Sequence, residues 1–238
     1  MKKLYLLLPL LLLATSCDET SSESSSVSVS DSSEVVDNSE SSMQALIEQE
    51  LSVIKNSPAP TSIRDSLYIK KDVKTYYENF ERKEHDKLHG YHYYYKEEKG
   101  LSDLNNPSSS YVTSSTVYYD GYYSYTLGSD DRYTKVEDER KITDLEFGFD
   151  FSVLENVSVE AKGYSYELTA TISKENANKF LGTTGKEIES INFISTSNGG
   201  RFLGFEITYE QNGFSVEREL QYSYSDIEFE LPTSQFIK

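Results

Sequence analysis

The sequence predicts a mainly β protein of the α+β class: one curved antiparallel sheet or open half-barrel, an N-terminal amphipathic helix and one short helix. Three observations predict this fold. From about residue 66 to 231, Tyr, Val, Ile, Phe and Thr alternate with charged residues, as in strands with one buried face. The dipeptides Asp120-Gly121, Lys162-Gly163 and Asn212-Gly213 are typical of tight hairpin turns. Only two segments have a helical pattern, too few to cover a flat sheet, so we expect the sheet to curl.

The chain begins with the pattern of a secretory signal peptide. Two lysines precede an apolar run over residues 4–13, and the small residues before Cys17 follow it. As a helix this run would measure only ~15 Å, too short to cross a hydrocarbon core of ~30 Å. Cys17, the only cysteine, directly follows Ala14-Thr15-Ser16, an arrangement that resembles the lipobox of bacterial lipoproteins. An ordinary signal peptide followed by a chance cysteine is the alternative.

The lipobox resemblance implies a lipid anchor. Residues 1–16 would be a lipoprotein signal peptide that is removed, and Cys17 would carry a diacylglycerol. The chain would then lie at the extracytoplasmic face of the cell membrane. Cleavage would remove two lysines and change the formal charge from −17 to −17 − 2 = −19. A chain this acidic is not expected to bind nucleic acid.

Residues 17–42 are predicted to be the lipidated cysteine and a disordered tether. Serine and acidic residues dominate residues 18–42, which contain no base. Such a composition buries too little apolar surface to offset chain entropy. We expect a single β-rich globular domain over residues 43–238.

That domain is predicted to open with an amphipathic helix. Ser41 or Ser42 can cap the helix, and Pro58 and Pro60 end it. Its apolar residues recur at helical spacing: Met43, Leu46, Ile47, Leu51 and Ile54. A second, short helix is expected over residues 173–182, capped by Ser173 and ended by Gly182.

The turns predict the strand registers. Tyr118 would face Tyr123 in the first hairpin, and Val159 would face Tyr166 in the second. In the third, Phe205 would face Leu220 and Leu203 would face Tyr222. A final strand is expected through Ile227, Phe229 and Leu231, and residues 141–156 fit either a strand or a helical turn.

The sequence gives little support for catalysis. The only cluster of metal-type residues is His85, Asp86, His89 and His92, and on a strand His89 and His92 would point to opposite faces. The chain has no Gly-x-Ser-x-Gly elbow, phosphate loop or dinucleotide fingerprint. We therefore expect no enzyme, no metal and no cofactor, although the many acidic pairs leave a two-carboxylate glycosidase open.

Two features have alternative readings. Arg218 falls on the apolar face of the last hairpin, opposite Ile207. It could snorkel to the rim, pair with an acid from a covering element, or bind the anionic head of a ligand. The 20 tyrosines suit a half-buried sheet surface, and they could also stack on sugars.

The layout resembles the LolA and LppX group of lipid-carrying, lipoprotein-associated domains. The resemblance covers about residues 43–236 and is carried by four features. These are the helix Met43–Ile54, the hairpin Val117-Tyr118-Tyr119-Asp120-Gly121-Tyr122-Tyr123, the strand–helix step Leu168–Leu181 and the ending Tyr222-Ser223-Tyr224-Ser225-Asp226…Leu231-Pro232. It implies an open half-barrel whose concave apolar face, lidded by helices, holds acyl chains without enzymatic activity or a cofactor.

We therefore predict a membrane-anchored lipoprotein that binds or carries a lipid or other hydrophobic ligand in the concave face of the sheet. The predicted ligand-binding residues are Leu46, Ile47, Leu51, Leu203, Phe205, Ile207, Arg218 and Leu220. The alternative is a non-enzymatic cell-surface module that binds a protein or polysaccharide. A large apolar pocket under the helix would favour the first function, and a filled core with an exposed tyrosine patch would favour the second.

Overall fold

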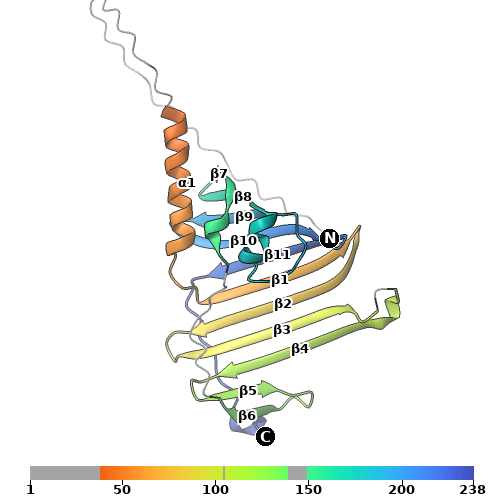
Figure 1. Ribbon diagram of the computed structural model, residues 1–238. Coiled ribbons are helices and arrows are strands. Elements are labelled where there is room, and N and C mark those ends of the chain that lie inside the picture. The colour runs from red at the N-terminus through yellow and green to blue at the C-terminus, as the bar shows by residue number, and fades with distance from the viewer. Residues whose placement is uncertain (1–37, 104, 139–148) are drawn as a thin grey trace, which may run out of the picture. The chain divides into compact units, whose positions relative to one another are not determined.

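The computed structural model of the 238-residue chain describes residues 38–103, 105–138 and 149–238. Within these residues, 11 strands form one open antiparallel sheet, which two α-helices and three short 3-10 helices accompany (Figure 1). This confirms the predicted mainly β class with one large antiparallel sheet. The expected signal peptide, Cys17 and most of the tether fall on residues 1–37, outside the described residues.

The sheet consists of two meanders that meet in its middle. The strand order is β6-β5-β4-β3-β2-β1-β11-β10-β9-β8-β7, so the first strand of one meander pairs with the last strand of the other. We call β1–β6 the tyrosine-rich half and β7–β11 the helix-covered half. The strands are β1 (Ser62–Lys71), β2 (Lys74–Asp86), β3 (Tyr91–Leu101), β4 (Ser110–Tyr119), β5 (Tyr123–Leu127), β6 (Tyr133–Glu137), β7 (Glu155–Lys162), β8 (Ser165–Ser173), β9 (Ser190–Asn198), β10 (Arg201–Gln211) and β11 (Phe214–Ser223).

The hairpin turns set the registers, one as predicted and two shifted. Asn212 and Gly213 both have positive φ, and Phe205 pairs with Leu220 as predicted. In the other two hairpins the central turn residues are Gly121-Tyr122 and Gly163-Tyr164, so Tyr118 pairs with Tyr125 rather than Tyr123, and Val159 with Leu168 rather than Tyr166. In each of these turns only the glycine has positive φ (97° and 66°), as in a type II′ turn. The shift is two residues, so the predicted faces are unchanged.

The two helices lie close to the predicted positions. Helix α1 (Asn38–Asn56) begins five residues earlier than predicted, so the last residues of the expected tether are helical instead of disordered, and it ends before Pro58. Helix α2 (Lys174–Phe180) has Ser173 at its N-cap position and is followed by Gly182 at a positive φ of 62°. Both stop signals therefore act as expected.

The predicted final strand does not form, and residues 224–238, which we call the C-terminal segment, take another path. Strand β11 already pairs with β1 on one side and β10 on the other, so it has no free edge for a following strand. The C-terminal segment instead crosses the tyrosine-rich half, where the Phe229 ring lies 5.8 Å from that of Tyr118. It reaches the outer strand β6 through a single parallel bridge between Tyr133 and Ile237.

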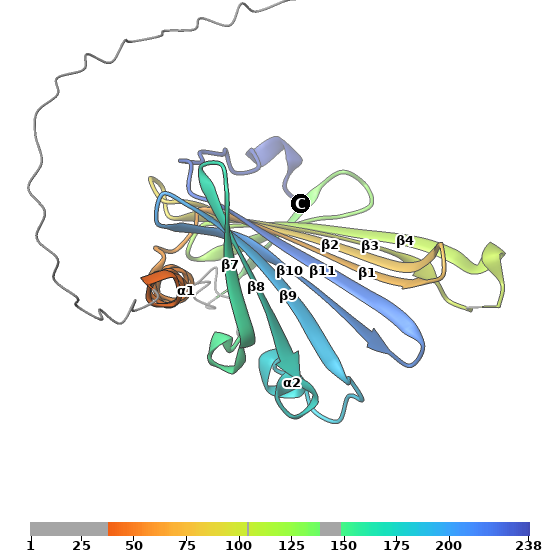
Figure 2. The same cartoon turned by 90° about the horizontal axis from the view of Figure 1, so that it is seen from above.

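The hydrophobic core lies on one face of the helix-covered half. Alternate residues of β8, β9 and β10 are buried, and α1, α2 and residues 149–154 pack over them. The 3-10 helix η2 (Phe151–Val153) belongs to this cover, whereas η1 (Pro107–Ser109) and η3 (Ser234–Phe236) lie elsewhere. Figure 2 shows α1 and α2 on one side of the sheet and the C-terminal segment on the other. The two faces therefore have different covers.

Candidate functional site

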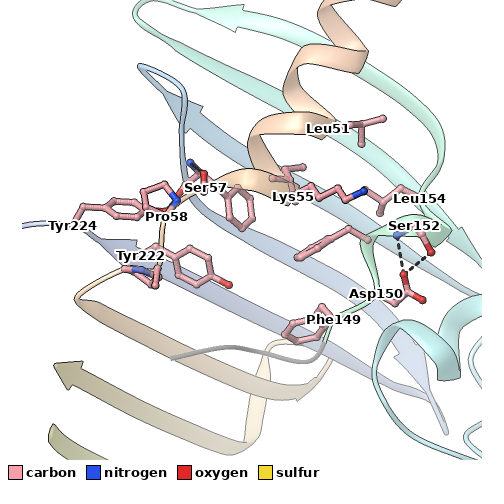
Figure 3. Close-up of a pocket in the computed structure, with 15 residues that line it drawn as sticks. Leu51, Lys55, Ser57, Pro58, Phe149, Asp150, Ser152, Leu154, Tyr222 and Tyr224 are labelled. Carbon is pink, nitrogen blue, oxygen red and sulfur yellow. Dashed lines mark hydrogen bonds between the residues drawn. The ribbon is translucent and has the colours of Figure 1, made fainter. Parts of the chain in front are cut away.

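A cavity of about 680 Å³ lies between the C-terminal end of α1, residues 149–154 and the sheet (Figure 3). It is on the core face of the helix-covered half. The lining residues are Leu51, Ile54, Lys55, Ser57, Pro58, Ala59, Pro60, Phe149, Asp150, Phe151, Ser152, Leu154, Phe202, Tyr222 and Tyr224. Most of these side chains are apolar or aromatic, as in pockets for small organic ligands.

The first wall is the end of α1 and the turn that follows it. Leu51 and Ile54 belong to the apolar stripe of the helix, and Lys55 follows Leu51 by one turn. Two prolines, Pro58 and Pro60, prevent the helix from continuing. The backbone N–H of Phe202 on β10 donates to Ser57 Oγ at 2.8 Å, which fixes the turn to the sheet.

The second wall is formed by residues 149–154. Asp150 caps η2, because its Oδ1 accepts from the backbone N–H of Ser152 at 3.0 Å and from Ser152 Oγ at 2.5 Å. Lys179 Nζ lies 3.0 Å from Asp150 Oδ2. The Ser152 hydroxyl, Lys179 and the Ser152 backbone N–H lower the pKa of Asp150 to about 2, so this carboxylate stays ionised and bound. The Phe149 ring meets that of Phe205 at 5.0 Å, edge to face, and so holds the wall against the core.

The floor consists of aromatic side chains of the sheet and the residues after it. The Tyr224 hydroxyl donates to the Phe202 carbonyl oxygen at 2.6 Å. The Phe202 and Tyr222 rings meet edge to face at 5.2 Å. Burial raises the pKa of both Tyr222 and Tyr224, so both phenols remain neutral. The floor therefore offers apolar area and no formal charge.

Of the eight predicted ligand-binding residues, only Leu51 lines this cavity. Leu46 and Ile47 are partly buried against the core. Phe205, Ile207 and Leu220 are 3%, 0% and 1% exposed, and they belong to the filled core. The predicted residues come from the helix and the sheet face that border this cavity, but most of them lie in the packed interior and not at its wall.

Leu203 departs from the predicted pattern because of a β-bulge. The β9–β10 register shifts between Phe202 and Gly204, so Leu203 is the extra residue. Gly204 has a φ of 137°, and a Cβ there would lie 2.0 Å from the Leu220 carbonyl oxygen. The bulge directs Phe202, which is 2% exposed, into the core, whereas Leu203 is outside the buried cluster. The β10–β11 register agrees with the predicted one, but its pairs begin at Gly204–Gln221, so the expected pair of Leu203 with Tyr222 is not among them.

Arg218 pairs with an acid of the sheet itself. It lies opposite Ile207 as predicted, and its Nε and Nη2 donate to the two carboxylate oxygens of Asp65 at 2.9 and 2.5 Å. Asp65 is 3% exposed and belongs to the neighbouring strand β1, not to a covering element. The guanidinium carbon also lies 5.1 Å from the centre of the Phe149 ring. Arg218 does not line the cavity, because its guanidinium group is bound to the buried carboxylate of Asp65.

The cavity residues that the sequence analysis missed come from three segments. Lys55 is not part of the apolar stripe of α1, and Ala59 lies beyond the end of that helix, so the stripe predicts neither of them. Phe149 and Phe151 lie in the segment that the sequence left ambiguous, although their alternation in Phe149-Asp150-Phe151 was a usable signal. The position of Phe202 at the cavity depends on the β-bulge, which the sequence did not predict.

The residues of the histidine cluster contact one another in pairs. His85 and His92 stack with ring centres 4.3 Å apart, and His89 Nδ1 lies 2.7 Å from the buried carboxylate of Asp86. No group of three potential metal ligands occurs among the described residues. Nor is any helix in the described ranges long and apolar enough to cross a membrane.

Comparisons with known proteins give no family. No family model matches the chain, and no curated protein matches it. One similar solved structure is the dehydratase domain from the terminal module of the rifamycin polyketide synthase. The similarity has a TM-score of 0.22 and 10% sequence identity, and it covers 75% of this chain and 79% of that one. A similarity at this level carries no argument about fold or function.

Proposed function

We propose that this protein binds a lipid or another hydrophobic ligand in the cavity beneath the C-terminal end of α1. The observation that carries the proposal is an aromatic and aliphatic cavity of about 680 Å³ under that helix. Small-molecule pockets typically enclose about 300–1,000 Å³ and have mostly apolar walls. Burial of the ligand's apolar surface would supply most of the binding free energy.

The charges at the rim favour an amphipathic ligand with an anionic head. Lys55 lines the cavity, is exposed and has no ion-pair partner among the described residues. Asp150, the carboxylate on the opposite wall, is already bound to Lys179 and Ser152. An anionic head could therefore reach the Lys55 ammonium group while the chain lies on the aromatic floor.

The helix-covered half would act as the concave part of an open half-barrel. In this proposal α1 and residues 149–154 form the lid, and β10 and β11 supply the floor. The resemblance to the LolA and LppX group supports this arrangement at the level of layout. The predicted residues Leu46, Ile47, Phe205, Ile207 and Leu220 would then support the site as packing residues rather than as ligand contacts.

We further propose that a lipid on Cys17 anchors the protein to the extracytoplasmic face of the membrane. The support is the charged start, the short apolar run and the cysteine after small residues. Two acyl chains on one diacylglycerol suffice for stable attachment. The variant Cys17→Ser should lose lipid labelling and leave the membrane fraction, and unchanged labelling would contradict the assignment.

The proposed role is binding, without catalysis, cofactor or nucleic acid. The chain has three histidines, all within eight residues. Two of them stack on each other and the third contacts Asp86, so each already has a structural partner. The formal charge of −17 opposes binding to nucleic acid.

A single introduced tryptophan tests the cavity directly, because the chain has none. Ala59 is an exposed residue at the cavity wall, so Ala59→Trp should fold and report on the cavity. Titration with oleate should shift its emission to shorter wavelength in a saturable way. The matched control is Val73→Trp in the fully exposed β1–β2 turn, which should not respond. Equal responses of the two reporters, or no response of either, would overturn the proposed site.

A surface interaction module remains the second candidate, and one observation favours it. Tyr122 and Tyr164 occupy the tips of two hairpins and are 76% and 96% exposed. Exposed tyrosines are common anchors at interfaces with proteins and sugars. If neither tryptophan reporter responds to oleate, the variant pair Tyr122→Ser and Tyr164→Ser should be examined for lost binding to cell-wall polysaccharide.

A further inference from the structure

A second, smaller pocket lies on the opposite face of the sheet, where β11, β1 and β2 run side by side. It encloses about 370 Å³ between the sheet and Ile227 of the C-terminal segment. Its lining includes Arg64 and Arg82, together with the neutral polar residues Ser62, Gln221 and Ser223. These strand residues alternate with those of the core face, and Tyr222 is the one residue that this pocket and the cavity under α1 have in common.

Two arginines stand directly opposite each other in this pocket. Arg64 on β1 is the register partner of Arg82 on β2. Like charges at such positions repel, because their Cβ atoms are only about 4.5–5.5 Å apart. The chain has 40 acidic and 23 basic residues and a formal charge of −17, so two arginines in directly paired positions are unexpected from its composition.

The two guanidinium groups differ in their surroundings. Arg82 is held in place: its Nε donates to Glu84 Oε1 at 2.8 Å, and its guanidinium carbon lies 5.9 Å from the centre of the Tyr93 ring. Glu84, the carboxylate in the pocket lining, is thereby engaged. Arg64 has no hydrogen-bond or ion-pair partner on its side chain within the described parts of the chain, and it is exposed.

Apart from Glu84, the other polar groups of the lining are neutral and can form hydrogen bonds. Gln221 is the register partner of Arg64 on the other side, and its Nε2 donates to Glu219 at 2.6 Å. Ser62 is 5% exposed and pairs with Ser223 across the strands. An incoming anion would thus meet one open guanidinium fork, a second guanidinium that is paired with Glu84, and several uncharged polar groups.

We propose that this pocket, the Arg64 pocket, binds a ligand that carries a carboxylate or phosphate group. The planar fork of Arg64 matches the oxygens of such an anion in a bidentate manner. Binding would also relieve the repulsion between the two arginines. The proposal does not rest on the hydrophobic ligand, since the two arginines lie on the other face and only Tyr222 lines both pockets.

The test is the thermal midpoint of the protein at constant ionic strength with added inorganic phosphate or glucuronate, alongside sedimentation with vesicles that contain phosphatidylglycerol. We expect a saturable increase of the midpoint with at least one free anion. Binding only to the vesicles, with the same dependence on Arg64, would assign the anionic group to a lipid headgroup.

Arg64→Gln should weaken this binding about tenfold or more, since a hydrogen bond to a charged group is lost. Without anion, the same variant should keep or raise the midpoint, because the repulsion with Arg82 is removed. Arg132→Gln is the matched control, since Arg132 is an exposed arginine between β5 and β6. No saturable binding in the wild type, or equal binding in wild type and Arg64→Gln, would overturn the proposal.

Discussion

The two halves of the sheet are covered by different elements, and their aromatic residues differ accordingly. Over the helix-covered half, the rings of Phe151, Phe180, Phe193 and Phe205 meet one another at 5.3–6.5 Å, and three of the four are at most 3% exposed. Over the tyrosine-rich half, one extended segment supplies Phe229, and the side chains around it stay partly exposed. The helices and residues 149–154 bury the rings beneath them, whereas the single extended C-terminal segment leaves its neighbours partly exposed.

Tyrosine suits the half with the thinner cover because its hydroxyl can remain bonded. The hydroxyls of Tyr77, Tyr95 and Tyr125 donate to the carboxylates of Glu98, Glu97 and Asp120 at 2.9, 2.9 and 2.8 Å. Burial and the hydrogen bond to Asp120 raise the pKa of Tyr125 to about 12. Rings thus contribute apolar area while the polar tips avoid a desolvation penalty. The partly exposed surface of the tyrosine-rich half therefore accounts for the many tyrosines of the chain.

The largest predicted effect comes from truncating an aromatic residue in each half. Phe193→Ala should lower the free energy of unfolding by about 3–5 kcal/mol, because the side chain is 1% exposed and its removal leaves a cavity. Phe229→Ala should cost only about 1–2 kcal/mol, since its neighbours are in contact with water. Urea unfolding monitored by circular dichroism measures both values. Equal losses would mean that the C-terminal segment forms a core as closed as that under the helices.

The bulge at Gly204 should be the next most sensitive point, and it belongs to the helix-covered half. Gly204→Ala combines a φ of 137° with a Cβ placed 2.0 Å from the Leu220 carbonyl oxygen. Strain and overpacking together should cost about 2–4 kcal/mol in urea unfolding. Gly121→Ala is the matched control, because a Cβ there meets no atom within 4 Å. A similar loss in both variants would show that backbone conformation alone, not the close approach in the bulge, sets the cost.

The same bulge marks the limit of what could be predicted from the sequence. Alternation and turn glycines predicted the antiparallel sheet, the faces and the Phe205–Leu220 register, because local sterics decide them. They could not predict the bulge, because it depends on the close approach of Gly204 to β11. Nor could they predict that β1 pairs with β11, since the contacting residues Asp65 and Arg218 are 153 positions apart in the sequence. For the same reason the helix and the sheet face that border the cavity could be predicted, whereas the wall around Phe149 could not.

Substitution of Glu50 tests how α1 packs on the helix-covered half. This carboxylate is 3% exposed and accepts a hydrogen bond from Ser197 Oγ on β9. Glu50→Ala should cost about 1–3 kcal/mol, because the buried Ser197 hydroxyl loses its partner. Glu50→Gln retains an acceptor and should cost less than about 1 kcal/mol. Equal losses in the two variants would show that the contact contributes only packing.

The smallest predicted effect is a pH dependence located in the tyrosine-rich half. Burial, together with Lys87, lowers the pKa of His85; burial, together with His85, lowers that of His92. In the unfolded chain both should titrate near 6.5, so below this pH the unfolded state binds more protons. The contribution of these two histidines to the free energy of unfolding should therefore be fully present above about pH 6.5. It should be lost as the pH falls through their lower pKa values in the folded protein.

Between pH 7 and pH 5 we expect a loss under about 1 kcal/mol, since both rings are partly exposed to water. The double variant His85→Phe/His92→Phe should show a flatter stability profile in urea unfolding across this range. The acids with lowered pKa values, such as Asp86 and Asp150, titrate below it. An unchanged slope in the double variant would assign the pH dependence to other groups.

The central claim is that the cavity beneath α1 holds a hydrophobic ligand, and native mass spectrometry tests it most directly. The wild-type protein, freed of lipid and mixed with oleate, should retain one bound oleate. Leu51→Trp places a larger side chain in the cavity wall and should abolish or strongly reduce this adduct while the protein stays folded. Ile194→Trp, at a position 40% exposed on the opposite face, should retain it. No adduct on the wild type, or equal adducts on all three proteins, would contradict the account.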